Sequence, residues 1–257
     1  MSILYNINSP LDQFDIKVFI GFISPFIDIT SFSITTFTIY TIIVLLVILS
    51  LVLLTDNNSL IIGSKWYVSQ EAMYDTIYNM VNNQIGGKEG GYYYPLIYSL
   101  FIFIFTANLI SMIPYSFAIT SHLLFVVSLS VIIWLGVTIT GLFKHGLVFF
   151  SLFVPAGCPL ALAPLLVLIE LLSYIARAIS LGLRLSANVL SGHLLLAILG
   201  TLIFNLMSIS LITFILGFIP IIALLAIVAL EFAIAIIQSY VFTILTSSYL
   251  KDAVYLH

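Results

Sequence analysis

Charged residues are scarce in this sequence. Seven lysines and arginines and ten aspartates and glutamates make up 7% of its 257 residues, against roughly 25% in ordinary soluble domains. A water-soluble domain needs more surface charge than this, so that class is excluded. Seven basic residues are also too few to neutralise a long phosphate backbone, which excludes a nucleic acid as a partner.

Cysteine occurs only once, as Cys158. A single cysteine cannot form an internal disulfide, and it lacks metal-ligand spacing, so neither a disulfide-rich fold nor a metal site is expected. No cofactor is expected either. Apolar residues are abundant instead: they make up 62% of the chain, and the mean hydropathy is +1.27. This composition predicts an all-α polytopic membrane protein.

The few charges mark where the chain leaves the bilayer. No Asp, Glu, Lys or Arg occurs between Asp28 and Asp56, or between Glu89 and Lys144. Because about 20 apolar residues cross the hydrocarbon core, the first interval holds one span and the second holds two, separated near Pro114. The predicted membrane helices are Ser33–Leu54, Leu96–Ile113 and His122–Leu142.

An amphipathic helix is predicted between the first two spans, at Trp66–Gln84. Met73, Ile77 and Met80 recur at helical spacing, with polar residues between them. Such a helix lies on the membrane surface or packs on a partner subunit, and the sequence leaves both possibilities open. The glycine-rich segment Gly86–Gly91 is predicted to be a flexible loop.

Two apolar stretches near the C-terminus are unusually long. Leu160–Phe204 and Ser208–Leu250 each exceed 40 residues, so each would extend about 60 Å as a helix, twice the thickness of the core. Hydropathy allows each to be a hairpin of two short spans or one long, tilted helix. Pro220, shortly after Gly217, is a possible kink.

Four formal charges lie inside these apolar stretches: Glu170, Arg177, Arg184 and Glu231. A charged residue at the centre of a membrane helix costs about 2.5–3.5 kcal/mol on insertion scales. Such residues usually face a cavity or a partner and serve transport. The structural alternative for Glu170 and Arg177 is an ion pair that only locks helices together.

The spacing of the polar residues indicates which of them share a helix face. Glu170, Arg177 and Arg184 are seven residues apart and lie on nearly the same face. Asn188 follows Arg184 by four residues and joins this face. His193 follows Arg184 by nine residues, so it points the other way, about 13 Å further along the axis.

A second set of polar residues occurs near the C-terminus. Glu231 and Gln238 are again seven residues apart and share a face, and Asp252 follows the apolar run. Glutamate and histidine can relay protons within a membrane. Arginine cannot, because its pKa exceeds about 12, so Arg184 is expected to act as a fixed positive charge.

The segment Gly182–Asn188, with the sequence GLRLSAN, is a recognisable motif when His193, Glu231 and Gln238 follow it at these separations. The chain resembles subunit a of the F-type ATP synthase, called subunit 6 in mitochondria. The opening Ser9–Phe14 and the pairing of His with Glu resemble the fungal mitochondrial form. The resemblance covers essentially the whole chain.

The resemblance implies a fold and a location. Five helices enter the membrane, and one amphipathic helix lies on the surface. Leu160–Phe204 and Ser208–Leu250 are each expected to be one continuous, tilted helix, and together they form a hairpin. Residues 1–28 form an N-terminal segment with a short leader removed near Ser9, and residues 29–257 form a single membrane domain. The implied location is the mitochondrial inner membrane. The implied partners are a ring of c subunits, the peripheral stalk and other Fo subunits, protons and the lipid bilayer.

The resemblance also implies a mechanism, namely proton translocation coupled to rotation by a stator subunit that is not an enzyme on its own. Arg184 separates two offset half-channels. The residues of the intermembrane-space half-channel are His193, Glu231, Asn188 and Gln238, and those of the matrix half-channel are Glu170 and Asp252. Arg177 either locks helices or takes part in conduction.

Three other functions are weighed against this one. A secondary transporter predicts internal repeats, and none is visible. A purely structural scaffold has no need for charges within apolar runs. A quinone-linked respiratory subunit predicts two intramembrane histidines at haem-ligand spacing, which the sequence lacks.

The positions of the lysines predict how the chain is oriented in the membrane. With five spans, the two termini lie on opposite sides of the membrane. Lys17 then lies on one side, and by the positive-inside rule the other side faces the matrix. The lysines predicted on the matrix side are Lys65, Lys88, Lys144 and Lys251.

Overall fold

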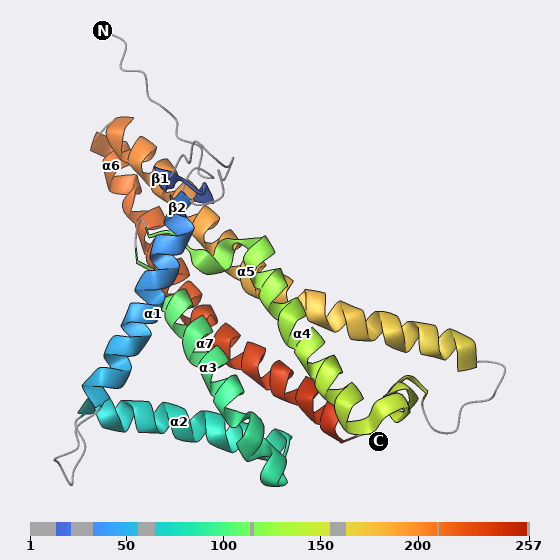
Figure 1. The fold of residues 1–257 in the computed structure, drawn as a ribbon. Helices are drawn as coiled ribbons and strands as arrows, with labels where there is room; N and C mark the ends of the chain where they lie inside the picture. The colour runs from blue at the N-terminus through green and yellow to red at the C-terminus, as the bar shows by residue number, and fades with distance from the viewer. Residues whose placement is uncertain are drawn as a thin grey trace.

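The computed structural model describes residues 14–21, 33–55, 65–113, 116–154, 163–209 and 211–255. Ser9, the predicted cleavage site, and Cys158 lie outside these ranges. Within them, five helical segments are long and apolar enough to cross a membrane. The predicted all-α polytopic fold is therefore confirmed (Figure 1).

The first three membrane helices are α1 (Thr36–Thr55), α3 (Gly87–Ser111) and α4 (Leu123–His145). Helix α2 (Lys65–Gln84) runs from the end of α1 towards the start of α3 (Figure 1). Its apolar residues face inward and contact α3 and the end of α7. The buried residues of α2 are Ile77, Met80 and Val81.

The predicted loop at Gly86–Gly91 is largely helical instead. Helix α3 begins at Gly87, so most of the Gly86–Gly91 segment forms its first turns. Packing overrides the low helix propensity of glycine here, because Tyr94 and Ile97 bury their side chains in a cluster with α2. After α4, a 3-10 helix occupies Gly146–Phe153 and returns its Phe149 ring to the same cluster.

The first long stretch is one continuous helix, α5 (Ala163–Ile209), of 47 residues. At 1.5 Å per residue it is about 70 Å long, more than twice the hydrocarbon core. The second stretch is divided into α6 (Leu211–Leu216) and α7 (Phe218–Val254). The division at Gly217 is consistent with Pro220. The ring of a proline in a helix clashes with the carbonyl group four residues earlier, which here belongs to Leu216, the last residue of α6.

Helices α5 and α7 form a long hairpin with α6 at its tip, as Figure 1 shows. The expectation of a single helix is thus correct for Leu160–Phe204 within the described residues. It is wrong for Ser208–Leu250, because the beginning of this stretch forms the separate short helix α6. Neither α5 nor α7 reverses direction, so the alternative of two short spans per stretch is excluded.

A two-stranded ribbon, which the sequence did not predict, lies at the opposite end of the molecule from the C-terminus (Figure 1). Strand β1 (Val18–Gly21) pairs antiparallel with β2 (Ser33–Thr35), which leads directly into α1. At the C-terminal end, Lys144 forms an ion pair with Glu89 at 2.6 Å. The His145 Nε2 atom lies 2.9 Å from the carbonyl oxygen of Val254. Lys144 therefore lies at the end of the molecule opposite Lys17.

Candidate functional site

A close crossing of α4 and α5 fixes the position of the long helix. Gly182 faces α4 so closely that a Cβ atom there would lie 2.6 Å from Ser130 Oγ and 2.9 Å from Val127 Cα. One turn further along α5, the Ser186 hydroxyl donates a hydrogen bond to the carbonyl oxygen of Ser121 at 2.9 Å. Small residues let two membrane helices approach in this way.

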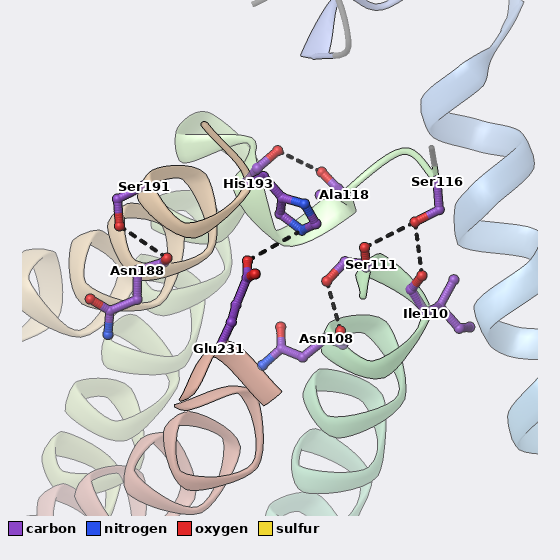
Figure 2. A network of polar contacts seen from close by, with 10 residues as sticks. Asn108, Ile110, Ser111, Ser116, Ala118, Asn188, Ser191, His193 and Glu231 are labelled. Atoms are coloured by element: carbon purple, nitrogen blue, oxygen red, sulfur yellow. Dashed lines mark hydrogen bonds and ion pairs between the residues drawn. The ribbon is translucent and has the colours of Figure 1, made fainter. Parts of the chain in front are cut away.

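The hairpin brings His193 of α5 and Glu231 of α7 together. The His193 Nε2 atom lies 4.0 Å from Glu231 Oε1, and the side chains are only 14% and 8% exposed. Among the described residues, neither the Nε2 atom nor either carboxyl oxygen has a hydrogen-bond partner. Figure 2 shows the two side chains pointing toward each other across the gap between the helices.

Gly192 makes room for this carboxyl group. A Cβ atom at Gly192 would overlap Glu231 Oε1 and would lie 2.7 Å from Glu231 Cδ. The Glu231 side chain therefore lies directly against the backbone of α5. This role of Gly192 was not predictable from local pattern, because glycines are common in membrane helices and the partner Glu231 is 39 residues away.

A small cavity continues from the pair. It is lined by residues of α3, α5 and α7, among them Ser111, Asn188, Glu231 and Gln238, and its volume is about 10 Å³. The Asn188 amide donates a hydrogen bond of 3.4 Å to Gln238 Oε1. A volume of this size is near the lower limit for one water molecule.

Asn108 on α3 is a buried polar residue that the sequence analysis missed. Its amide nitrogen donates a 3.2 Å hydrogen bond to the Ala235 carbonyl oxygen of α7, and its side chain is fully buried. Its Oδ1 atom has no partner among the described residues. The sequence feature that could have indicated it is an amide side chain near the end of the predicted apolar span Leu96–Ile113.

A second polar group lies at the other end of the hairpin. The Arg177 guanidinium contacts Glu170 Oε1 at 3.0 Å on its own helix and Asp252 Oδ2 at 3.6 Å on α7. All three side chains are about one-third exposed. The cluster joins the first half of α5 to the last turn of α7.

Arg184 lies between the two polar groups along α5. It is exposed, and within the described part of the chain it forms no ion pair. By helix geometry it is about 10 Å along the axis from Arg177 and about 13 Å from His193. The exposed residues near it are mixed: Ile179 and Leu183 are apolar, whereas Ser180 and Asn188, one turn away on either side, are polar.

This arrangement offers two separate sets of titratable groups and a fixed positive charge between them. The described residues include no cluster of three metal-ligating side chains. The groups present suit proton transfer, since carboxylates and imidazole both exchange protons near neutral pH when their surroundings allow it.

Comparison with known proteins identifies the family of this chain. The model of the ATP synthase A chain family matches residues 36–251. The chain belongs to this family.

Individual members of the ATP synthase A chain family are similar to this chain over nearly their whole length. Identity to the ATP synthase subunit a of Wickerhamomyces canadensis is 77%, over 98% of both chains. Identity to that of Saccharomyces cerevisiae is 66%, over 98% of this chain and 97% of the relative. Identity to that of Yarrowia lipolytica is 53%, over 98% of both chains. The family indicated by the GLRLSAN motif is thus confirmed.

Proposed function

We propose that the chain is the proton-conducting stator subunit of an F-type ATP synthase in the mitochondrial inner membrane. Its family and its fungal relatives, each named ATP synthase subunit a, support this assignment. The proposed partners are a rotating ring of c subunits, the peripheral stalk and other Fo subunits. The chain carries protons and is not catalytic by itself.

The entry route is proposed to run from the intermembrane space through the His193–Glu231 pair. Direct proton transfer needs a hydrogen bond of about 3 Å, so the 4.0 Å separation calls for a bridging water or a small approach of the side chains. Asn188 and Gln238 line the adjoining cavity, where they can orient a water molecule. From there the proton passes to a carboxylate on the ring.

The exit route to the matrix is proposed to pass Glu170 and Asp252. Both carboxylates contact Arg177 and are partly exposed. An arginine stays protonated, so Arg177 is a fixed positive charge in contact with both carboxylates. The same contacts join two helices, so the locking and conducting roles of Arg177 are compatible.

Arg184 is proposed to separate the two routes. The observation that carries the whole proposal is its position, exposed on α5 between a buried His–Glu pair and a carboxylate cluster. A fixed cation on this surface attracts an ionised ring carboxylate and repels a free proton. A neutral carboxylate can then leave toward lipid, and an ionised one cannot.

The test is ATP-driven proton pumping and ATP synthesis by the whole complex in vesicles. Arg184→Ala should abolish both while the subunit still co-purifies with the ring. Arg184→Lys should also perform poorly, because a compact ammonium lacks the planar guanidinium fork. Ser180→Ala, one turn away on the same helix, is the matched control and should behave normally. Normal synthesis in Arg184→Ala would refute the proposal.

A further inference from the structure

An aromatic residue outside the membrane helices contacts the proposed entry site. The Phe14 ring lies edge-on to the His193 ring, with centroids 6.4 Å apart and an interplanar angle of 75°. Phe14 is half-buried and stands just before strand β1. The contact joins residues that are 179 positions apart in the sequence.

The segment that carries Phe14 is anchored to the membrane domain. Strand β1 pairs with β2 through Val18 and Thr35. The Thr36 N–H donates to the Lys17 carbonyl oxygen at 3.0 Å, and the Lys17 N–H donates to Thr36 Oγ1 at 3.3 Å. Since α1 begins at Thr36, these bonds hold residues 14–21 at one end of α1.

The His193 ring has few polar restraints on its orientation among the described residues. Its Nε2 atom lacks a hydrogen bond within the described part of the chain, and Glu231 at 4.0 Å is its ion-pair partner there. An edge-on aromatic contact has a preferred geometry and so favours one ring orientation over others. Phe14 is placed to supply this restraint.

We propose that Phe14 is a positioning residue: it holds the His193 imidazole toward Glu231. This role rests on the proposed function of the pair in proton entry. It assigns to the N-terminal segment a part in conduction, although that segment lies outside the membrane helices.

The same segment provides a matched control. Phe19 is 73% exposed, and no described ring lies against it. Phe14→Ala and Phe19→Ala remove the same atoms from positions five residues apart. Phe14→Tyr keeps the ring and serves as the conservative variant.

The experiment measures ATP synthesis by the whole complex in vesicles, as a function of pH on the side of the N-terminus. Phe14→Ala should lower the rate about 2- to 10-fold, the range expected for loss of one aromatic contact, and should change the shape of the pH profile. Phe14→Tyr and Phe19→Ala should keep the original profile. Assembly is checked by the amount of complex in each membrane.

A double variant separates this role from a structural one. If Phe14 acts through His193, Phe14→Ala should cause no further loss in a His193→Gln background. An unchanged pH profile in Phe14→Ala, or fully additive losses in the double variant, would overturn the proposal. If His193→Gln alone is without effect, the proposed entry route itself fails, and that result is distinct from a failure at Phe14.

Discussion

Glu231 and His193 meet at 4.0 Å although they belong to different helices and stand 38 residues apart in the chain. Each presents polar atoms that lack a hydrogen-bond partner among the described residues. Buried polar groups are normally paired. An unpaired carboxyl beside an unpaired imidazole therefore indicates a site that is completed by water or by a transferred proton.

Replacing either member of this pair should slow proton entry. Glu231→Gln and His193→Gln each remove a proton-accepting group of similar shape, and we expect ATP synthesis in vesicles to fall at least about tenfold. The double variant should lose less than the product of the two effects, because the residues act in series.

The control for this pair is Ser191→Ala. Ser191 is exposed on the same helix and donates its hydroxyl to the Asn188 carbonyl oxygen of that helix. Its removal should leave the rate unchanged. Near-normal synthesis in either Glu231→Gln or His193→Gln would contradict the relay.

A methyl group at Gly192 should displace the Glu231 carboxyl. Gly192→Ala and Gly200→Ala gain the same helix propensity, about 1 kcal/mol, but nothing lies within 4 Å of a Cβ at Gly200. We expect Gly192→Ala to assemble and to conduct protons slowly, whereas Gly200→Ala should resemble the parent. Adding Glu231→Asp, which shortens the side chain, should recover part of the rate. Equal rates in the two alanine variants would show that the close contact is unimportant.

Asp252→Asn tests whether the Arg177 cluster conducts or only locks the helices. An ion pair that is one-third exposed is worth at most about 1 kcal/mol, so its loss should not prevent assembly. If Asp252 serves proton exit, ATP synthesis should fall while the amount of assembled complex stays the same. An unchanged rate with less complex would assign the cluster to helix locking.

Gly182→Val should separate α4 from α5. The added atoms meet Ser130 Oγ and the Val127 backbone, and backbone cannot move aside as a flexible side chain does. We expect a loss of about 1–3 kcal/mol in stability, as in other overpacked interiors. The measurement is the amount of assembled subunit remaining after synthesis is stopped. Gly200→Val is the control and should persist, because its position is open.

Much of the architecture was accessible from the sequence because charge is so rare in it. Asp28, Asp56 and Lys144 delimited apolar intervals whose lengths fix the number of spans. The predicted helix boundaries were less accurate at Gly87 and Gly217. At Gly87 tertiary packing overrode propensity, and at Gly217 a glycine–proline combination broke a helix that was predicted to be continuous.

The site was predictable only where spacing along one helix was informative. The seven-residue spacing of Glu170 and Arg177 placed them on one face, and they are in contact. The sequence did not predict the roles of Asn108, Gly192 and Phe14, because each contacts a residue that is far away in the chain. No local pattern reports that Asn108 of α3 contacts Ala235 of α7, or that Phe14 contacts His193 of α5.

The length of α5 has a consequence for the supply of this subunit in the cell. A helix of 47 residues is too long to stand upright in a core about 30 Å thick. When it lies across the core instead, Glu170, Arg177 and Arg184 enter hydrocarbon at a high cost unless protein or water receives them. A newly made chain without its neighbours has no stable resting position in the bilayer. Free copies should therefore be short-lived, and the amount of the subunit that accumulates is set by the amount of its partners.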